Sequence, residues 1–265
     1  MFFPFTIKAS TISQLQRETP VFSVAEDVTP DKATRKAQLW SYLNSTAGVI
    51  DGKSLKELWF PKGRYHIFLS HSHEDIALAR YLKAWLSYFC GLRCFIDTDV
   101  WENAYDLLRD LDKKYSKPME SSSYDYNRRN QTTAHVYSIL TMALFEAIDE
   151  IECPILIESS NSVTLKDGIE RGTLSPWIYE EVGYMGKLPH IVPSRFPRMG
   201  YFSVGKESVI LNESAVRDSL QMTHPLDVSG FKSIDKNDLI AMKFFKRENA
   251  LNELYKRKIL LKKQY

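Results

Sequence analysis

Cysteine is scarce in this sequence, and long apolar runs are absent. The chain has three cysteines, Cys90, Cys94 and Cys153, and the C-x3-C spacing of the first two has neither a second pair nor a histidine cluster beside it. A zinc site is therefore not expected, and we predict no other metal site. We expect the three thiols to be small buried side chains. Their low, odd number favours a cytoplasmic protein, because the cytosol keeps thiols reduced.

No stretch of the chain reaches the roughly 18 apolar residues that a helix needs to cross a bilayer. The apolar start, Met1–Phe5, is short and lacks the basic region of a signal peptide. An excess of one charge is also missing, because 35 Lys and Arg stand against 33 Asp and Glu, for a net charge of +2. A general nucleic-acid binder usually has a marked basic excess. We therefore expect neither a membrane nor nucleic acid among the partners.

Basic residues do gather near the C-terminus, at Lys256, Arg257, Lys258, Lys262 and Lys263. Cations near the end of a helix interact favourably with the helix dipole, so a solvated helix end would explain them. A patch that binds a partner or nucleic acid is the alternative.

What the sequence does contain is an alternation of strand and helix patterns. The strand candidates are short apolar runs at residues 65–70, 93–96, 153–157 and 190–192. The main helix candidates have apolar residues at helical spacing, at residues 75–90, 101–111, 136–151, 236–245 and 247–262. A strand–helix–strand unit implies a parallel pair with a right-handed crossover. We predict an α/β fold with a flavodoxin-like, doubly wound parallel sheet.

Both ends of the chain are predicted to be helical extensions of this main domain. Residues 1–61 would form an N-terminal extension, with helices that begin near Thr29 and Gly52. The main domain would cover residues 62–230, with a polar, turn-rich insertion at about residues 116–131. Residues 231–265 would be C-terminal helices.

Two polar signals follow predicted strands. The first is the loop Ser70–Asp75, with the sequence Ser-His-Ser-His-Glu-Asp. The second is a helix begun by Ser175 and Pro176, which would put Trp177 and Glu181 one turn apart on the same face. In the flavodoxin-like order, ligands bind beside the carboxyl ends of the first and third strands. We therefore expect Glu181 to face the loop Ser70–Asp75.

Three of these segments resemble elements of Toll/interleukin-1 receptor (TIR) domains. His66–His71 resembles their opening strand, Arg93–Asp97 their second strand, and Ser175–Glu181 their S-x-W-x3-E element. The resemblance covers roughly residues 63–192. Phe68–His73 and Ala250–Tyr255 are similar to bacterial stand-alone TIR proteins, among them those of the Thoeris antiphage system.

The resemblance implies an enzyme of the NAD glycohydrolase or ADP-ribosyl cyclase type, with NAD as its substrate and no cofactor. It implies that Glu181 is the essential glutamate. The products would be nicotinamide and an ADP-ribose-type signal, cyclic or conjugated in some forms, in antiphage defence. A homo-oligomer, a phage-derived activator and a downstream effector that senses the product are the further partners that it suggests.

The physical chemistry of this reaction agrees with a carboxylate at the site. Nicotinamide leaves as a neutral molecule, and a carboxylate stabilises the positive charge that develops on the ribose. An aromatic ring such as Trp177 or Trp101 would stack on a base or shield the site from water. The expected substrate-binding residues are Ser70, His71, Ser72, Asp97, Trp101 and Trp177.

Each of these residues also has a simpler explanation. Glu181 could be a solvated helix residue, with Glu180 as the neighbouring candidate, and Trp177 could anchor the core. Asp97 could cap a helix, and the loop histidines and serines could satisfy local backbone groups. Two other functions stay open, namely a non-catalytic TIR interaction module and a nucleoside-processing enzyme of related fold, in which a glutamate attacks the sugar.

Overall fold

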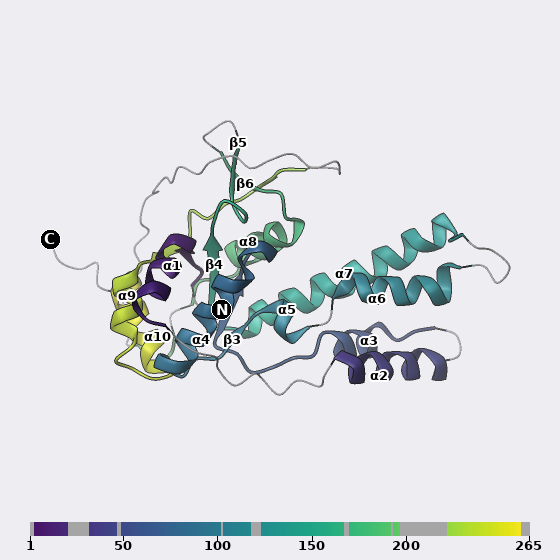
Figure 1. Cartoon of the computed structure of the whole chain (residues 1–265), viewed down its shortest axis with the longest axis horizontal. Helices are drawn as coiled ribbons and strands as arrows, with labels where there is room; N and C mark the ends of the chain where they lie inside the picture. Colours follow the sequence, from purple (N-terminus) through teal and green to yellow (C-terminus); the bar gives the residue numbers. More distant parts are fainter. Residues whose placement is uncertain are drawn as a thin grey trace. The chain divides into compact units, whose positions relative to one another are not determined.

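The computed structural model describes residues 3–20, 32–46, 49–101, 103–117, 123–166, 170–191, 193–196 and 222–260. The chain divides into two units (Figure 1). The first, here called the sheet unit, consists of residues 1–25, 64–96 and 148–265. The second, here called the helical unit, consists of residues 26–63 and 97–147.

A parallel five-stranded sheet forms the centre of the sheet unit, in the order β3-β2-β4-β1-β8. Its strands are β1 (Phe5–Lys8), β2 (Ile67–Ser70), β3 (Cys94–Phe95), β4 (Cys153–Glu158) and β8 (Lys232–Ile234). The runs predicted at residues 65–70, 93–96 and 153–157 are thus confirmed as strands. The α/β class and the parallel sheet are confirmed with them, and this arrangement is compatible with a flavodoxin-like fold.

The N-terminal strand β1 was not predicted. It pairs in parallel with β4 on one side and with β8 on the other, so it lies inside the sheet. Residues 1–61 are therefore not a single helical extension, and β8 makes the C-terminal segment part of the sheet as well. The prediction failed because this strand has only four residues, Phe5–Lys8. Its apolar and polar residues alternate, but so short a run does not identify a strand by its periodicity.

The strand expected at residues 190–192 is not found among the described residues. His190 and Ile191 lie outside any strand, and Val192 lies outside the described residues. An apolar triplet alone does not distinguish a strand from an extended connection.

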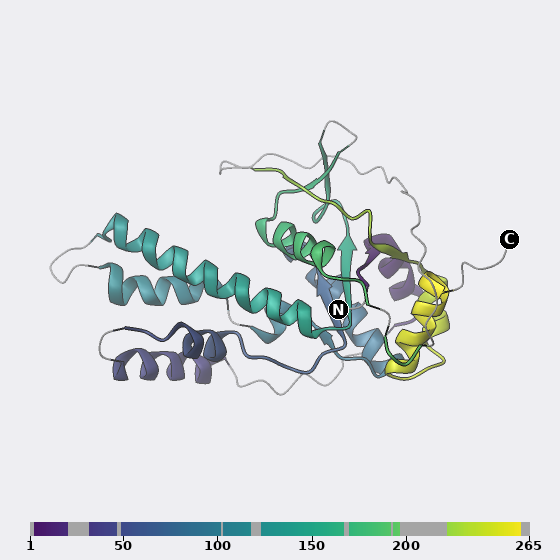
Figure 2. The ribbon, with the colours of Figure 1, turned by 180° about the vertical axis from the view of Figure 1, so that it is seen from behind.

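Helices cover both faces of the sheet. On one face, Ile155 and Ile157 pack in the main core with side chains of α1 (Ala9–Glu18), α4 (Ile76–Cys90), α9 (Lys236–Met242) and α10 (Glu248–Tyr255). On the other face, Leu156 packs against Ile178 and Val182 of α8 (Pro176–Lys187). Figure 2 shows β4 with α8 on one side and α1 on the other. Successive side chains along β4 therefore point to opposite layers, as the pleat of a strand requires.

Local sequence signals account for two helix ends. Ser175 caps α8, because its hydroxyl accepts the Ile178 N–H at 3.3 Å, and Pro176 occupies the first turn. Gly91 ends α4 in the left-handed conformation, at φ +65°, which a side chain would disfavour.

A second, antiparallel sheet of three short strands extends beyond the carboxyl end of β4 (Figure 1). Its strands are β5 (Thr164–Lys166), β6 (Glu170–Thr173) and β7 (His224–Pro225). β6 ends at Thr173, two residues before Ser175, so this small sheet connects the end of β4 to the start of α8.

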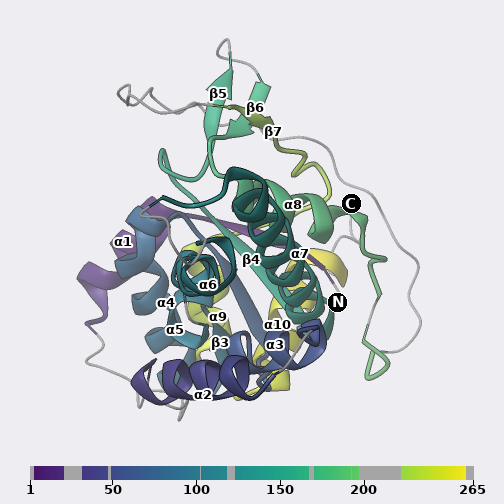
Figure 3. The ribbon, with the colours of Figure 1, turned by 90° about the vertical axis from the view of Figure 1, so that its right-hand side faces the viewer.

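The helical unit contains α2 (Lys32–Ser45), α3 (Gly52–Trp59), α5 (Asp97–Val100), α6 (Ala104–Leu111) and most of α7 (Tyr126–Glu150), which are labelled in Figure 3. The end of α7, from Ile148, belongs to the sheet unit. Thr29–Asp31, where the helix start was expected, lies outside the described residues. The expected loop at residues 116–131 is shorter than predicted, because α7 begins at Tyr126 and a π-helical turn, Asp112–Ser116, follows α6. Arg129 donates to Asp112 at 3.1 Å, which ties the start of α7 to that turn.

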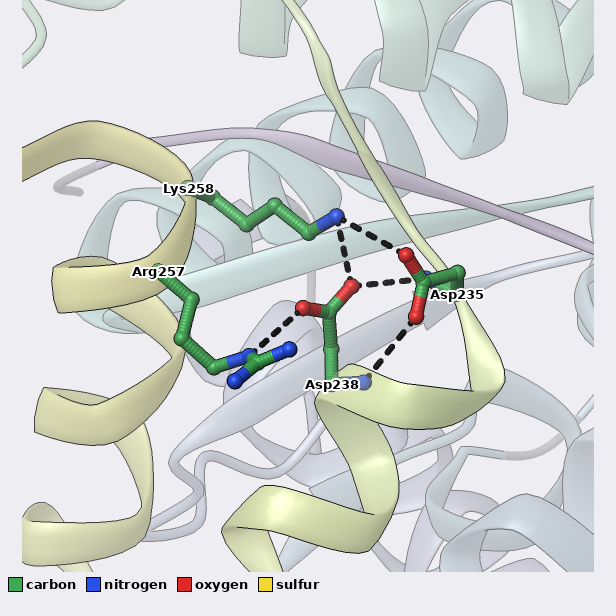
Figure 4. Close-up of polar contacts among 4 residues, drawn as sticks. All are labelled: Asp235, Asp238, Arg257 and Lys258. Carbon is green, nitrogen blue, oxygen red and sulfur yellow. Dashed lines mark hydrogen bonds and ion pairs between the residues drawn. The ribbon is translucent and has the colours of Figure 1, made fainter. Parts of the chain in front are cut away.

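A cluster of four charged side chains, here called the C-terminal ion cluster, joins α9 to the π-helical turn Lys256–Leu260 (Figure 4). Asp235 and Asp238 form a capping box, and each accepts the other's backbone N–H. The buried Asp238 also accepts Arg257 Nε at 2.9 Å and Lys258 Nζ at 2.6 Å. Two of the basic residues near the C-terminus thus have a structural role, while Lys262 and Lys263 lie outside the described residues.

All three cysteines are buried and unpaired, as predicted. Burial raises the pKa of Cys90 to about 12 and that of Cys153 well above its usual value. The folded state therefore disfavours the thiolate, and the stability that Cys90 contributes at neutral pH is lost as pH rises from the ordinary thiol value towards 12.

We expect the native thiols to resist modification. With a pKa of about 12, Cys90 at neutral pH should react with an aromatic disulfide roughly 10³-fold more slowly than an ordinary cysteine does, because only the thiolate is nucleophilic. Rates would be measured with and without denaturant, and unfolding should release three reactive thiols. Rapid labelling of Cys90 in the folded protein would contradict this environment.

Within the described residues, no helix has the length and apolar character needed to cross a membrane. In the same part of the chain, no group of three or more His, Cys, Asp and Glu side chains is arranged to hold a metal ion.

Candidate active site at the carboxyl ends of β2 and β4

The centre of the candidate site is a hydrogen bond between Ser70 and Glu181. The Ser70 hydroxyl donates to Glu181 Oε2 at 2.5 Å. Both side chains are buried, with 1% of Ser70 and 6% of Glu181 exposed. A carboxylate is rarely buried to this extent without a partner, because its desolvation is costly. The predicted approach of Glu181 to the loop after β2 is thus confirmed at Ser70.

The chain brings these two groups together through simple periodicities. Ile67 and Leu69 point into the main core, so Ser70 points to the opposite face of the sheet, which α8 covers. On α8, Glu181 lies between the buried positions Ile178 and Val182 and shares their inward side. The apolar residues that anchor α8 on β4 therefore also direct the carboxylate to the end of β2.

The loops that follow β2 and β4 are joined by Asp75. One oxygen of this buried carboxylate accepts Asn161 Nδ2 at 3.0 Å, and the other accepts the Ser159 hydroxyl. Ser162 closes the second loop, because its hydroxyl donates to Ile157 O at 2.8 Å and accepts the Ser159 N–H at 2.9 Å. Both loops at this edge of the sheet are therefore held in defined positions before any ligand binds.

His71 and Ser72 lie in the first of these loops and are half-buried. His71 Nδ1 is 3.0 Å from Leu69 O, and because a carbonyl only accepts, Nδ1 carries the proton. Nε2 is then the acceptor nitrogen of the neutral ring. Ser72 precedes the 3₁₀ turn His73–Asp75, and its carbonyl accepts the Asp75 N–H at 2.8 Å.

Trp177 is half-buried on the first turn of α8, one turn before Glu181, as the spacing predicted. The site residues Ser70, His71, Ser72, Trp177 and Glu181 all belong to the sheet unit.

Asp97 and Trp101 belong to the helical unit. Asp97 opens α5, and its carbonyl accepts the Trp101 N–H at 2.7 Å. Trp101 is 6% exposed, its ring meets Phe60 edge to face at 5.2 Å, and its indole N–H donates to Pro61 O at 3.2 Å. Trp101 is therefore a core residue of the helical unit. Because its ring is buried, it offers no open face for stacking on a base. The role expected for Asp97 stays a prediction.

An ion pair that was not predicted from the sequence lies at the same edge of the sheet. Arg171 of β6 donates through Nη1 to Glu158 Oε1 at 3.0 Å, and 7% of the Glu158 side chain is exposed. Glu158 is the last residue of β4, so its position directly after the apolar run could have identified it. Arg171 had no comparable signal, because β6 is short and polar.

Comparison of the chain with family models, with curated proteins and with solved structures finds no match in any of the three.

Proposed function

We propose that the protein cleaves the bond between nicotinamide and ribose in NAD, with Glu181 as the catalytic carboxylate. The observation that supports this function best is the buried Ser70–Glu181 hydrogen bond at the carboxyl ends of the parallel strands. Ligands of open α/β sheets bind at this edge, beside the point where the strand order reverses. A buried carboxylate at such an edge is suited to stabilise a positive charge, because few water molecules screen it.

In this reaction, the electron pair of the C–N bond leaves with the nicotinamide ring, which becomes neutral. The positive charge that remains is shared between C1′ and the ring oxygen of the ribose. Glu181 would stabilise that charge, while the Ser70 hydroxyl holds one carboxylate oxygen in place. Water then adds to C1′ and loses a proton, and the products are ADP-ribose and nicotinamide. If a nucleophile of the same ADP-ribosyl group adds in place of water, the product is a cyclic ADP-ribose. If a nucleophile of a second molecule adds, the product is a conjugated ADP-ribose.

Trp177 and His71 would have supporting roles in this scheme. The half-buried indole, one turn from the carboxylate, would limit the access of water to the charged ribose. The Nε2 atom of His71 is available as a hydrogen-bond acceptor for a ribose hydroxyl, because Nδ1 is engaged with Leu69 O. A signal in antiphage defence, made by a TIR enzyme in the cytoplasm, remains the biological setting that we propose.

The test is the incubation of the purified chain with NAD, followed by mass analysis of all products. We expect nicotinamide together with one species that has the mass of ADP-ribose or of its cyclised or conjugated form. Nucleosides are included as substrates, because their hydrolysis without turnover of NAD would replace this proposal with a nucleoside-processing activity. If no substrate turns over, with or without lysate of phage-infected cells, the interaction-module hypothesis replaces it.

A further inference from the structure

We propose that Arg171 binds the phosphate groups of the substrate. This inference rests on the proposed function, because it identifies the residue that would recognise the pyrophosphate of NAD beside Glu181. Three features of the protein point to this role: the position of Arg171, its buried partner, and a neighbouring cation.

The position follows from strand register. Ser70 of β2 is the register partner of Leu156 of β4, and Glu158 is two residues further along the same strand. Leu156 packs against α8, so Glu158 shares the face of the sheet to which Ser70 points. Arg171, which is bound to Glu158, therefore lies on the same face and at the same edge as the Ser70–Glu181 pair.

The buried partner orients the guanidinium. Glu158 holds Nη1, and it is the one side-chain acceptor that Arg171 meets among the described residues. A guanidinium has five N–H donors in a rigid plane, so one anchored corner leaves donors for a second anion. About a fifth of the Arg171 side chain, 20%, is exposed to solvent. An arginine fixed in this way has lost much of its conformational freedom before it meets a ligand.

A second cation lies beside Arg171. Lys8 of β1 is the register partner of Glu158 and is exposed. Because Phe5 and Ile7 point into the main core, Lys8 points to the face that carries Glu158 and Arg171. Arg171 and Lys8 therefore place two cations beside the Glu158 carboxylate. The same edge also has the buried carboxylates of Glu181 and Asp75, so the donor geometry of Arg171, rather than the net charge, favours an anion here. Arginine is the residue best matched to phosphate oxygens, which it binds with two parallel hydrogen bonds.

The consequence concerns how the substrate is held for cleavage. Binding energy from the phosphates, which do not react, would keep the nicotinamide ribose beside Glu181. The site would then favour NAD over nicotinamide riboside, which has the same scissile bond and no phosphate.

The test compares Arg171→Gln with a matched control, Arg195→Ala. Arg195 is also a partly exposed arginine bound to a glutamate, Glu152, but that residue lies before β4, at the amino end of the sheet. A double variant, Glu158→Gln with Arg171→Gln, removes both charges and leaves no buried carboxylate unpaired. Dissociation constants for ADP-ribose and for inorganic pyrophosphate would be measured by titration calorimetry, which needs no turnover.

We expect both Arg171 variants to weaken the binding of ADP-ribose by about 10–100-fold, as the loss of charge-assisted hydrogen bonds implies. The KM for NAD should rise, the KM for nicotinamide riboside should stay unchanged, and Arg195→Ala should bind ADP-ribose like the wild type. Equal binding by the Arg171 variants and the wild type, or no binding of either probe to the wild type, would overturn the inference. If both probes depend on Arg171 but no nicotinamide is released, the phosphate site stands and the proposed reaction fails.

Discussion

Replacing Glu181 with glutamine is expected to lower the rate of nicotinamide release from NAD by about 10²–10³-fold, the usual cost of losing one preorganised electrostatic group. Glutamine keeps the shape of the side chain and can still accept the Ser70 hydrogen bond. The loss of rate would therefore measure the contribution of the negative charge. The charge matters because the ribose becomes positive only as the C–N bond breaks. The loss should therefore be found in kcat, with a smaller change in KM.

The control is Glu180→Gln, which removes the same charge from the neighbouring position. Glu180 is half-buried and Glu181 is buried, so the two substitutions compare a carboxylate at the candidate site with one beside it. We expect Glu180→Gln to keep most of the wild-type rate. The catalytic assignment would fail if both variants were equally active. It would also fail if Glu181→Gln lost activity only in proportion to a fall in its folded fraction, which circular dichroism would measure.

Replacing Asp238 with alanine is expected to reduce the free energy of unfolding by about 2–4 kcal/mol. This carboxylate is 1% exposed and accepts three donors, namely Arg257, Lys258 and the backbone N–H of Asp235 (Figure 4). In the alanine variant, these three donors would lose their acceptor. The side chains of Arg257 and Lys258 are 35% and 22% exposed, so water can hydrate them in part once Asp238 is removed. We therefore expect a smaller loss of unfolding free energy than for a fully buried ion pair.

Urea denaturation would measure this loss, and hydrogen exchange across residues 256–260 would locate it. The control is Asp235→Asn, because asparagine also caps helices and the pair between Asp235 and Lys258 is exposed, at 3.3 Å. We expect that variant to lose less than about 1 kcal/mol. If both variants lost the same free energy of unfolding, the stabilisation would come from the exposed part of the C-terminal ion cluster rather than from Asp238.

Much of the candidate site could be predicted from local patterns. The Ser-Pro start of α8, the one-turn spacing of Trp177 and Glu181, and the polar loop after β2 are short-range features, and the physics of caps and helical periodicity acts over the same few residues. Their meeting followed from one rule about parallel sheets, which holds wherever strand order reverses.

The roles of Arg171 and Trp101 could not be predicted from local patterns. Arg171 lies on a short, polar strand, so no periodicity indicated which face it occupies. Glu158 could be found from its position after an apolar run, but only the fold shows that it pairs with Arg171. Trp101 was expected at the site as an aromatic ring that could stack on a base, but its ring packs against Phe60 in the helical unit.

Local patterns were sufficient to predict the α/β class, three of the five strands of the central sheet, and the position of Glu181 on its helix, because these depend on apolar periodicity and capping within single elements. The place of β1 inside the sheet, and the edge that Glu158, Arg171 and Lys8 share with Ser70 and Glu181, became known only from the fold. Strand order and register depend on which distant segments pair most favourably, and that preference is not encoded in any one segment.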